Sequence, residues 1–169
     1  MPIPSGYVSG QVVQAVPTSV ATAIFNETQA SGTAGGTFTS GSYVKRTLNT
    51  TVVNNIAGCS IASSVITLPA GTYEVFASAP AFSVNAHHIR FANTTDSLYY
   101  YGSNSKAPTA NADSDCNLSL LTTYFTITGA KSFELQHRCG STRATDGLGI
   151  TTTFGDSEIY SQITITKVA

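Results

Sequence analysis

The three histidines are the first side chains to consider for metal or acid–base chemistry, because imidazole serves both roles near neutral pH. His87 and His88 are adjacent, so in a strand they point to opposite faces and do not share one ligand. His88 and His137 lie in separate strand-like segments, where cross-strand pairing would let them bind a metal ion. Neither has an acidic partner at a fixed spacing. The sequence therefore favours polar, half-exposed or interface histidines and predicts no metal ion.

The acidic stretch Asn111-x-Asp113-x-Asp115 resembles the start of a calcium-binding loop. Cys116 stands where the turn glycine of such a loop belongs, and Thr122 stands where its closing glutamate belongs. We therefore predict a solvated loop. Within it, Asn111 and Asp113 are candidates for contact with a receptor or a partner subunit.

A pair of carboxylates that flanks a sugar linkage is the requirement for glycoside hydrolysis. Glu74, Glu134 and Glu158 are the candidates, and the sequence does not set their separation. The chain has no Gly-x-Ser-x-Gly nucleophile elbow, no paired Cys/His signature and no phosphate-binding loop. We therefore expect no enzymatic activity and no cofactor.

Cys59, Cys116 and Cys139 make an odd number of cysteines, and their spacing matches no zinc or redox motif. We predict that they are small buried or half-buried residues, which is the commonest role of a free cysteine.

The consecutive tyrosines Tyr99, Tyr100 and Tyr101 are candidates for receptor or interface contacts. In a strand they must show at least one ring to each face, and tyrosine offers a large contact area with a polar tip. The alternative is that they fill the core and a subunit interface. The polar loops 102–115 and 140–149, the second with Arg143, would extend a receptor surface, because binding residues concentrate on loops.

The composition restricts the partners. Of 169 residues, 41% are hydrophobic and only 10% are charged, and the net charge is -1. No basic run is present to bind nucleic acid, and no apolar run approaches the roughly 20 residues of a membrane span. The start, residues 1–6, lacks the basic and apolar regions of a signal peptide, so we expect synthesis in a host cytoplasm.

Short alternating segments separated by turn residues predict an antiparallel β-sandwich. The clearest signal is Leu68, which ends one strand before Pro69 and Gly71, residues typical of a type I turn. Pro80 is expected to end the next strand or to place it at a sheet edge. The predicted strands are Ser42–Leu48, Val65–Leu68, Thr72–Ser78, Ala86–Phe91, Leu98–Tyr101, Leu118–Thr128, Lys131–Arg138, Leu148–Phe154 and Glu158–Val168.

Residues 1–36 differ from the rest of the chain. The Gly-rich stretch 31–36 reads as a flexible hinge, and a helix over 16–29 is a weaker possibility. We predict two parts, an extended N-terminal docking arm with its hinge (1–36) and a β-sandwich knob (37–169). The candidate docking residues of the arm are Tyr7, Val12, Ile24 and Phe25.

The stretch Leu68–Ala81, followed by His88–Asn93, resembles the jelly-roll domain of bacteriophage fibres and other virion surface proteins. That domain is similar in shape to the trimeric knob of tumour necrosis factor-like proteins. The resemblance covers about residues 40–168, and its other carriers are Arg46–Asn49, Phe133–His137 and Glu158–Ile165. It implies an all-β antiparallel jelly roll and a homotrimer.

The same resemblance implies a location on the virion surface. About 36 residues precede the knob, without the heptads or short repeats of a fibre shaft. The expected function is therefore a non-enzymatic structural protein docked on the capsid as a decoration or head-fibre protein. Its partners would be itself and other virion proteins, such as the capsid or fibre base. The alternative is a tail-fibre tip adhesin that binds a host surface glycan or protein.

Overall fold

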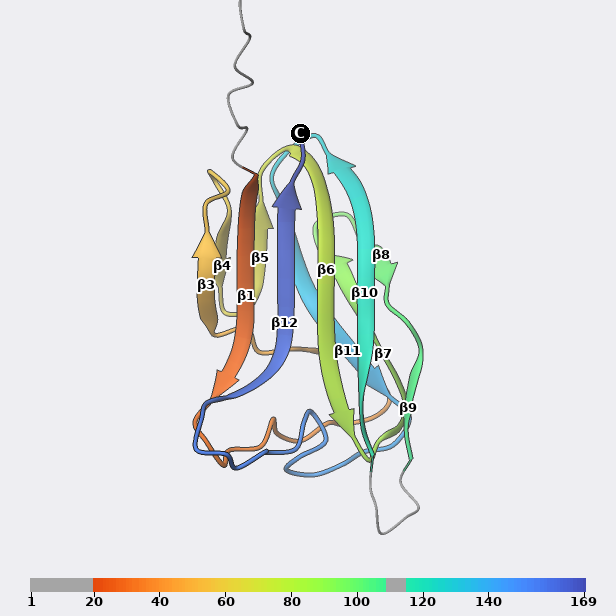
Figure 1. Ribbon diagram of the computed structural model, residues 1–169. Helices are drawn as coiled ribbons and strands as arrows, with labels where there is room; N and C mark the ends of the chain where they lie inside the picture. The colour runs from red at the N-terminus through yellow and green to blue at the C-terminus, as the bar shows by residue number, and fades with distance from the viewer. Residues whose placement is uncertain (1–19, 109–114) are drawn as a thin grey trace, which may run out of the picture.

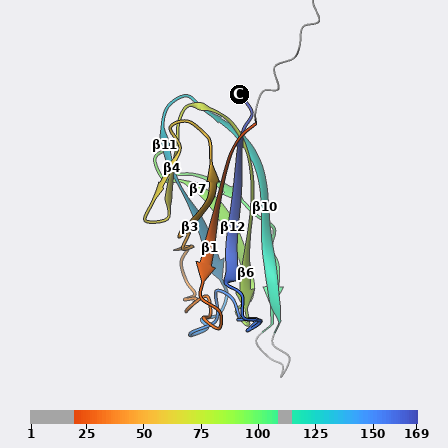
Figure 2. The ribbon, with the colours of Figure 1, turned by 60° about the vertical axis from the view of Figure 1, so that its left-hand side comes forward.

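The computed structural model describes residues 20–108 and 115–169 of the chain. Every regular element in these residues is a β-strand, and no helix among them is long and apolar enough to cross a membrane. The strands form two antiparallel sheets (Figure 1), and a rotated view shows the sheets packed face to face (Figure 2). This arrangement is an all-β jelly-roll sandwich, as the sequence predicts.

The first sheet has five strands in the order β10-β6-β12-β1-β3. The strands are β1 (Ala21–Gln29), β3 (Thr50–Asn54), β6 (Gly71–Phe82), β10 (Cys116–Ile127) and β12 (Glu158–Lys167). The pair β6–β10 is continuous along both strands, from Cys116 opposite Phe82 to Ile127 opposite Gly71.

The second sheet has seven strands, with the order β4-β5-β11-β7-β8 and two short additions, β2 on β11 and β9 on β7. The strands are β2 (Val44–Lys45), β4 (Ser60–Ala62), β5 (Val65–Leu68), β7 (Asn85–Asn93), β8 (Leu98–Tyr101), β9 (Ser105–Ala107) and β11 (Lys131–Cys139). Its long central strands, β7 and β11, position the candidate site.

The core lies between the sheets and contains an aromatic cluster at its centre. The ring of Phe91 stacks on Phe133 with centroids 4.7 Å apart, and Phe125 lies 5.2 Å from Phe133. Tyr100 stacks on Phe125 at 4.8 Å. Aromatic pairs of this kind contribute about 0.5–1.5 kcal/mol each beyond the burial of their area, so this cluster is a main link between the sheets.

Strand β1 comes from the region that the sequence predicts as an arm. The helix considered for residues 16–29 is wrong over its described part, because β1 pairs with β12 on one side and with β3 on the other. Residues 21–29 are therefore part of the sandwich. Residues 1–19 lie outside the described residues, and for them the docking arm stays a prediction.

Pro80 does not end β6, which continues to Phe82. Strand β12 pairs with β6 only as far as Ser78, whereas β10 continues beside β6 beyond that point. Pro80 therefore lies where β6 has a ladder partner on one side only, which is the edge position expected for a residue without an N–H group.

Ile159 does not lie on the same face of β12 as Ile163 and Ile165. The register of β12 against β1 shifts by one residue between Ile159 and Gln162, and this irregularity reverses the alternation. Ile163 and Ile165 are buried, whereas Ile159 points outward and is half exposed. Tyr160 is buried.

Two predicted strands are also corrected. Leu148–Phe154 forms no strand, because the carboxylate of Glu158 accepts the backbone N–H groups of Thr152 and Thr153, at 3.1 and 3.2 Å. Ser42–Leu48 contracts to β2, since the N–H of Leu48 donates to the Ser64 hydroxyl rather than to a ladder partner.

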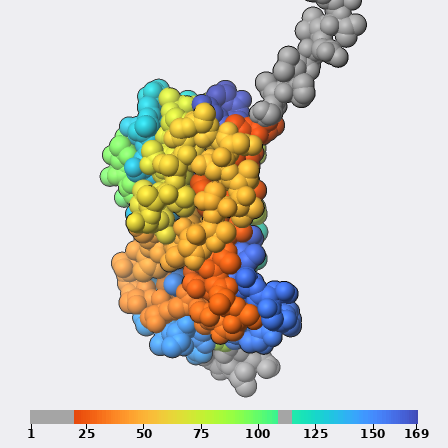
Figure 3. All heavy atoms as spheres, turned by 90° about the vertical axis from the view of Figure 1, so that its left-hand side faces the viewer, coloured from red at the N-terminus to blue at the C-terminus, as the bar shows by residue number. Residues whose placement is uncertain are grey.

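The Gly-rich stretch 31–36 is held against the loop that follows β11. The Gly35 N–H donates to the carbonyl of Gly149 at 2.9 Å, and the Gly36 N–H donates to that of Thr145 at 3.1 Å. Figure 3 shows the orange N-terminal segment and the blue segment side by side at the lower end of the sandwich, the end at which β1 finishes in Figure 1. The stretch therefore closes one end of the knob, and the prediction of a flexible hinge is wrong for it.

A fully buried ion pair connects β1 to the segment after β2. Arg46 is 0% exposed, and its Nε and Nη2 atoms donate to one carboxylate oxygen of Glu27, at 3.0 and 2.7 Å. Nη2 also donates to the carbonyl of Leu148 at 2.8 Å. Burial lowers the pKa of Arg46, and the negative charge of Glu27 opposes that shift. Through Arg46, the segment after β2 is therefore joined both to β1 and to the loop that contains Leu148.

Candidate functional site

The outer face of the second sheet carries a cluster of aromatic and basic side chains. Strand alternation turns Ile89 and Phe91 of β7 into the core and His88 and Arg90 outward. Tyr101 of the neighbouring strand β8 lies opposite Arg90 in the register. We call this cluster the tyrosine–arginine surface, and it consists of Tyr43, His88, Arg90, Tyr99 and Tyr101.

Arg90 lies between two tyrosine rings of this surface. Its guanidinium carbon is 3.6 Å from the ring centroid of Tyr43 and 3.9 Å from that of Tyr99. Its Nε atom donates to the side-chain oxygen of Gln136 at 2.7 Å. Each cation–π contact contributes about 0.5–1 kcal/mol at an exposed position. The stack fixes the ring planes before any ligand arrives.

His88 is held in one tautomer by its two partners. Its Nδ1–H donates to the amide oxygen of Asn104 at 2.9 Å, which leaves Nε2 as the acceptor for the hydroxyl of Tyr43. Burial raises the pKa of Tyr43, although the nearby positive charge of Arg90 opposes that shift. The tyrosine therefore stays a neutral hydrogen-bond donor, and it orients the imidazole at the mouth of a pocket.

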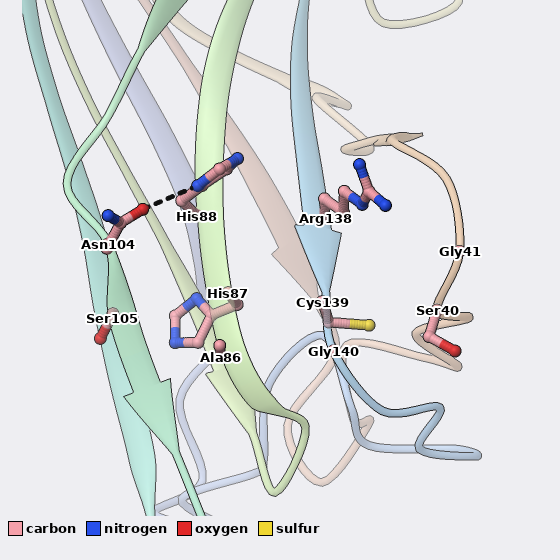
Figure 4. Close-up of a pocket in the computed structure, with 10 residues that line it drawn as sticks. All are labelled: Ser40, Gly41, Ala86, His87, His88, Asn104, Ser105, Arg138, Cys139 and Gly140. Carbon is pink, nitrogen blue, oxygen red and sulfur yellow. Dashed lines mark hydrogen bonds between the residues drawn. The ribbon is translucent and has the colours of Figure 1, made fainter.

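That pocket has a volume of about 500 Å³ and lies beside the tyrosine–arginine surface (Figure 4). It is formed by the loop before β2, the start of β7, the start of β9 and the end of β11. Figure 4 shows His88 between Asn104 on one side and Arg138 on the other. The polar residues that line it are Ser40, His87, His88, Asn104, Ser105 and Arg138.

None of the described residues that line this pocket is acidic. Arg138 is exposed and has neither an ion pair nor a side-chain hydrogen bond with any residue in 20–108 or 115–169. Its guanidinium carbon lies 5.9 Å from the centroid of Tyr43. The pocket thus presents a positive charge together with uncharged donors and acceptors.

The predicted approach of His88 to His137 as a metal-binding pair is wrong, because His137 lies beside His87 instead. His137 faces the core and lies 3.0 Å, nitrogen to nitrogen, from His87, whereas His88 is on the opposite face of the sheet. Burial lowers the pKa of His87 to about 4 and lowers that of His137 well below its usual range. Among the described residues, no three His, Cys, Asp or Glu side chains gather to hold a metal ion.

The three tyrosines of β8 divide between the two faces. Tyr99 is 42% exposed and Tyr101 is 58% exposed, and both belong to the tyrosine–arginine surface. Tyr100 points inward and stacks on Phe125, so the receptor contact considered for it is wrong. This division is the one that strand alternation requires.

Arg143 is separate from the tyrosine–arginine surface. Its guanidinium donates two hydrogen bonds to Asp146, at 2.6 and 3.0 Å, and lies 5.1 Å from the ring centroid of Phe82. These contacts occupy the side chain within its own loop. The candidates Asn111 and Asp113 lie outside the described residues.

The structure describes two of the four docking candidates of the N-terminal region, Ile24 and Phe25. Phe25 is 0% exposed in the core, so it stabilises the fold, and the docking contact predicted for it is wrong. Ile24 is half-buried on the outer side of β1. Tyr7 and Val12 lie outside the described residues.

The glutamates considered for glycoside hydrolysis do not converge. Glu74 points outward from the first sheet and Glu134 points outward from the second. Glu158 is buried, and its carboxylate accepts hydrogen bonds from loop backbone groups, including the Gly32 N–H at 3.2 Å. These hydrogen bonds lower the pKa of Glu158, with the Thr152 N–H as the largest cause. No two of the three flank a common cleft.

The outer face of the first sheet is a second exposed surface, and it is apolar. Phe76 of β6 lies opposite Thr122 of β10, and Tyr124 and Leu120 flank Thr122 along β10. Tyr124 is 66% exposed. We call this surface the apolar face, and its members are Phe76, Leu118, Leu120, Tyr124 and Ile159.

Sequence reasoning identified Tyr99 and Tyr101 but did not assign their partners. The alternation of β7 and β11 is the signal that could have placed His88, Arg90 and Arg138 on one face, but the prediction from the sequence paired His88 with His137 instead. Tyr43 lies in a loop, 45 positions from its partner His88, so no local pattern could connect them.

Comparisons with known proteins find the fold in solved structures. No family model and no curated protein matches the chain. A crystal structure of murine APRIL at pH 5.0 is 8% identical, with a TM-score of 0.56 over 88% of this chain and 99% of that one. An Eiger TNF structure from S. frugiperda is 10% identical, with a TM-score of 0.54 over 89% of this chain and 93% of that one.

The globular domain of zebrafish complement 1qA is also similar. It is 10% identical, with a TM-score of 0.51 over 89% of this chain and 97% of that one. At such identities the likeness concerns the fold alone. The chain therefore has a jelly roll of the tumour necrosis factor and C1q type.

Proposed function

We propose that this chain is a non-enzymatic bacteriophage virion protein, a homotrimeric jelly roll that docks on the capsid surface as a decoration or head-fibre protein. The phage and capsid assignments rest on the sequence resemblance carried by Leu68–Ala81 and His88–Asn93. The trimer draws support from the fold and from the apolar face.

The apolar face is the observation that carries this proposal. Phe76, Leu120 and Tyr124 are each 43–66% exposed, on a sheet whose strands are otherwise well packed. Among the outward positions of β6, β10 and β12, the single charged residue is Glu74. A second copy of the chain fits such a face, because apolar burial gains about 25 cal/mol per Å² and few charges must be desolvated.

The two ends of the sandwich have different roles in this proposal. Val20, where the described chain begins, lies beside the C-terminus, since Ala21 pairs with Lys167. The pocket lies at the start of β7 and the end of β11, which is the opposite end. Docking through residues 1–19 would therefore leave the pocket directed away from the particle.

The tyrosine–arginine surface favours a second candidate function, that of an adhesin. Its exposed rings, and the adjacent Arg138 without an ion pair among the described residues, are features of a recognition surface rather than of a shell contact. In this role the chain would form a fibre tip that binds a host surface glycan or protein.

Two measurements test the proposal. Light scattering of the purified chain should give about three times the protomer mass of 17.6 kDa, and a monomer mass would refute the trimer. Antibody labelling of purified phage particles should place the chain over the capsid. Labelling confined to the tail would refute the decoration role and support the adhesin.

A further inference from the structure

We propose that the pocket beside the tyrosine–arginine surface binds the carboxylate of an acidic sugar in a surface glycan. This inference deepens the receptor-binding role proposed above and rests on it. Its starting point is the contrast between Arg138, which is without a polar partner in the described chain, and a pocket lining that holds no carboxylate.

Charge selects the class of ligand. Arg90 belongs to the neighbouring tyrosine–arginine surface, but its guanidinium is packed between Tyr43 and Tyr99 and its Nε donates to Gln136. Arg138 has no such polar partner in residues 20–108 or 115–169, so its fork of N–H groups is available for two parallel hydrogen bonds to a carboxylate. In a pocket of about 500 Å³ this charge favours a small anionic group over a neutral one.

The other polar groups suit the hydroxyls of a sugar ring. Ser40 and Ser105 stand on opposite sides of the pocket. The Ser40 hydroxyl shares a hydrogen bond with the Thr142 hydroxyl at 3.1 Å and keeps a lone pair to accept another, and the Ser105 hydroxyl can both donate and accept. Asn104 accepts a hydrogen bond from His88 and keeps its NH₂ group for a ligand, because no acceptor in the described residues takes it. Adjacent hydroxyls on a rigid ring match donors and acceptors that are spread around a pocket in this way.

An apolar wall completes the match. The exposed ring of Tyr101 contacts His88 edge-on, with centroids 6.0 Å apart, and continues the pocket onto the tyrosine–arginine surface. A sugar ring has a C–H face that packs on an aromatic ring, and a second sugar of the chain would reach this tyrosine. An extended peptide would instead need a free sheet edge or a longer groove, whereas the residues lining this pocket come from short, separate segments.

The test uses the full chain and matched probes in isothermal titration calorimetry. The probes are trigalacturonate as the free acid, its methyl ester, and galactose 6-sulfate, with sialyllactose and lactose as a second acidic and neutral pair. Binding of at least one carboxylate probe, with its neutral partner at least about tenfold weaker, is the expected result. Binding that favours the sulfate over both carboxylate probes, or equal binding of acid and ester, overturns the proposal.

Variants locate the site. Arg138→Gln should weaken carboxylate binding about tenfold to a hundredfold, and Arg138→Lys should retain part of it. Lys167→Gln removes the same charge at the opposite end of the sandwich and should leave binding unchanged. Undiminished binding by Arg138→Gln overturns the pocket assignment.

The mass and the particle location of each variant are measured in parallel. A chain that is trimeric and present on particles but binds no acidic sugar overturns this inference alone. A monomeric chain that still binds the carboxylate overturns the trimer and leaves the pocket assignment standing.

Discussion

The Arg46–Glu27 pair is the residue-scale contact with the largest expected effect on stability. Arg46→Met would leave the Glu27 carboxylate buried without its partner, and breaking a pair of this kind costs about 3–5 kcal/mol. Urea unfolding at fixed protein concentration measures this loss. Arg143→Met, which breaks the part-exposed pair with Asp146, is the matched control and should cost about 1 kcal/mol or less. Equal losses in the two variants would contradict the prediction.

The buried pair of His87 and His137 predicts a pH dependence. Both pKa values are lowered in the folded chain, mainly by burial, and that of His87 is about 4. In the unfolded chain both imidazoles bind a proton near pH 6.5, whereas in the folded chain they stay neutral to lower pH. Protonation therefore favours the unfolded chain, and stability should fall as the pH decreases from about 6.5 toward 4. The loss from His87 is roughly 2 kcal/mol. Urea midpoints measured at pH 7.5, 6 and 4.5 check this.

The matched control for that pH series is the double variant His87→Leu with His137→Leu. It lacks both imidazoles, so its midpoint should change less over the same interval. A wild-type midpoint that is constant from pH 7.5 to 4.5 would rule out a contribution from the pair.

At the scale of elements, Glu158 links the start of β12 to two loops. Its carboxylate accepts the N–H groups of Gly32, Thr152 and Thr153 and the Thr152 hydroxyl. Glu158→Gln replaces one of the acceptor oxygens by a donor, so the three amides should exchange faster with deuterium. Hydrogen-exchange mass spectrometry measures this, with Glu74→Gln, an exposed glutamate on β6, as the control. Unchanged exchange at residues 152–153 would show that the carboxylate does not hold the loop.

Strand β1 sets how far the N-terminal region can be shortened. Deletion of residues 1–19 should leave a folded knob, because β1 keeps its place between β12 and β3. This knob should no longer join particles, because it lacks the proposed docking arm. Deletion of residues 1–36 removes β1 and should prevent folding, as circular dichroism would show. If particles incorporate the shorter deletion, residues 1–19 are not the docking arm.

The whole-molecule prediction concerns the apolar face. Leu120→Glu places a charge on it in each copy, and three such charges brought together would repel and require desolvation. We expect a folded monomer by light scattering and circular dichroism. Leu98→Glu is the control, because Leu98 is similarly exposed but belongs to the second sheet. A trimer that persists in Leu120→Glu would show that the interface lies elsewhere.

Strands with a local pattern can be predicted from the sequence. The bounds Val65–Leu68 and Leu98–Tyr101 are confirmed, and the faces of β7 and β11 follow directly from alternation. Alternation also divided the three tyrosines between the core and the surface. These features depend on neighbours one or two positions apart, and the sequence displays such neighbours directly.

Features that join distant residues are visible only in the folded chain. Arg46 meets the carbonyl of Leu148 across 102 positions, and Tyr43 meets His88 across 45. The place of β1 in the first sheet depends on its partners β12 and β3, since short apolar runs fit a helix or a strand equally well. The pocket likewise exists only because four separate segments converge at one end of the sandwich. Contacts between residues so far apart in the sequence depend on how the whole chain packs, and local sequence patterns carry no information about that packing.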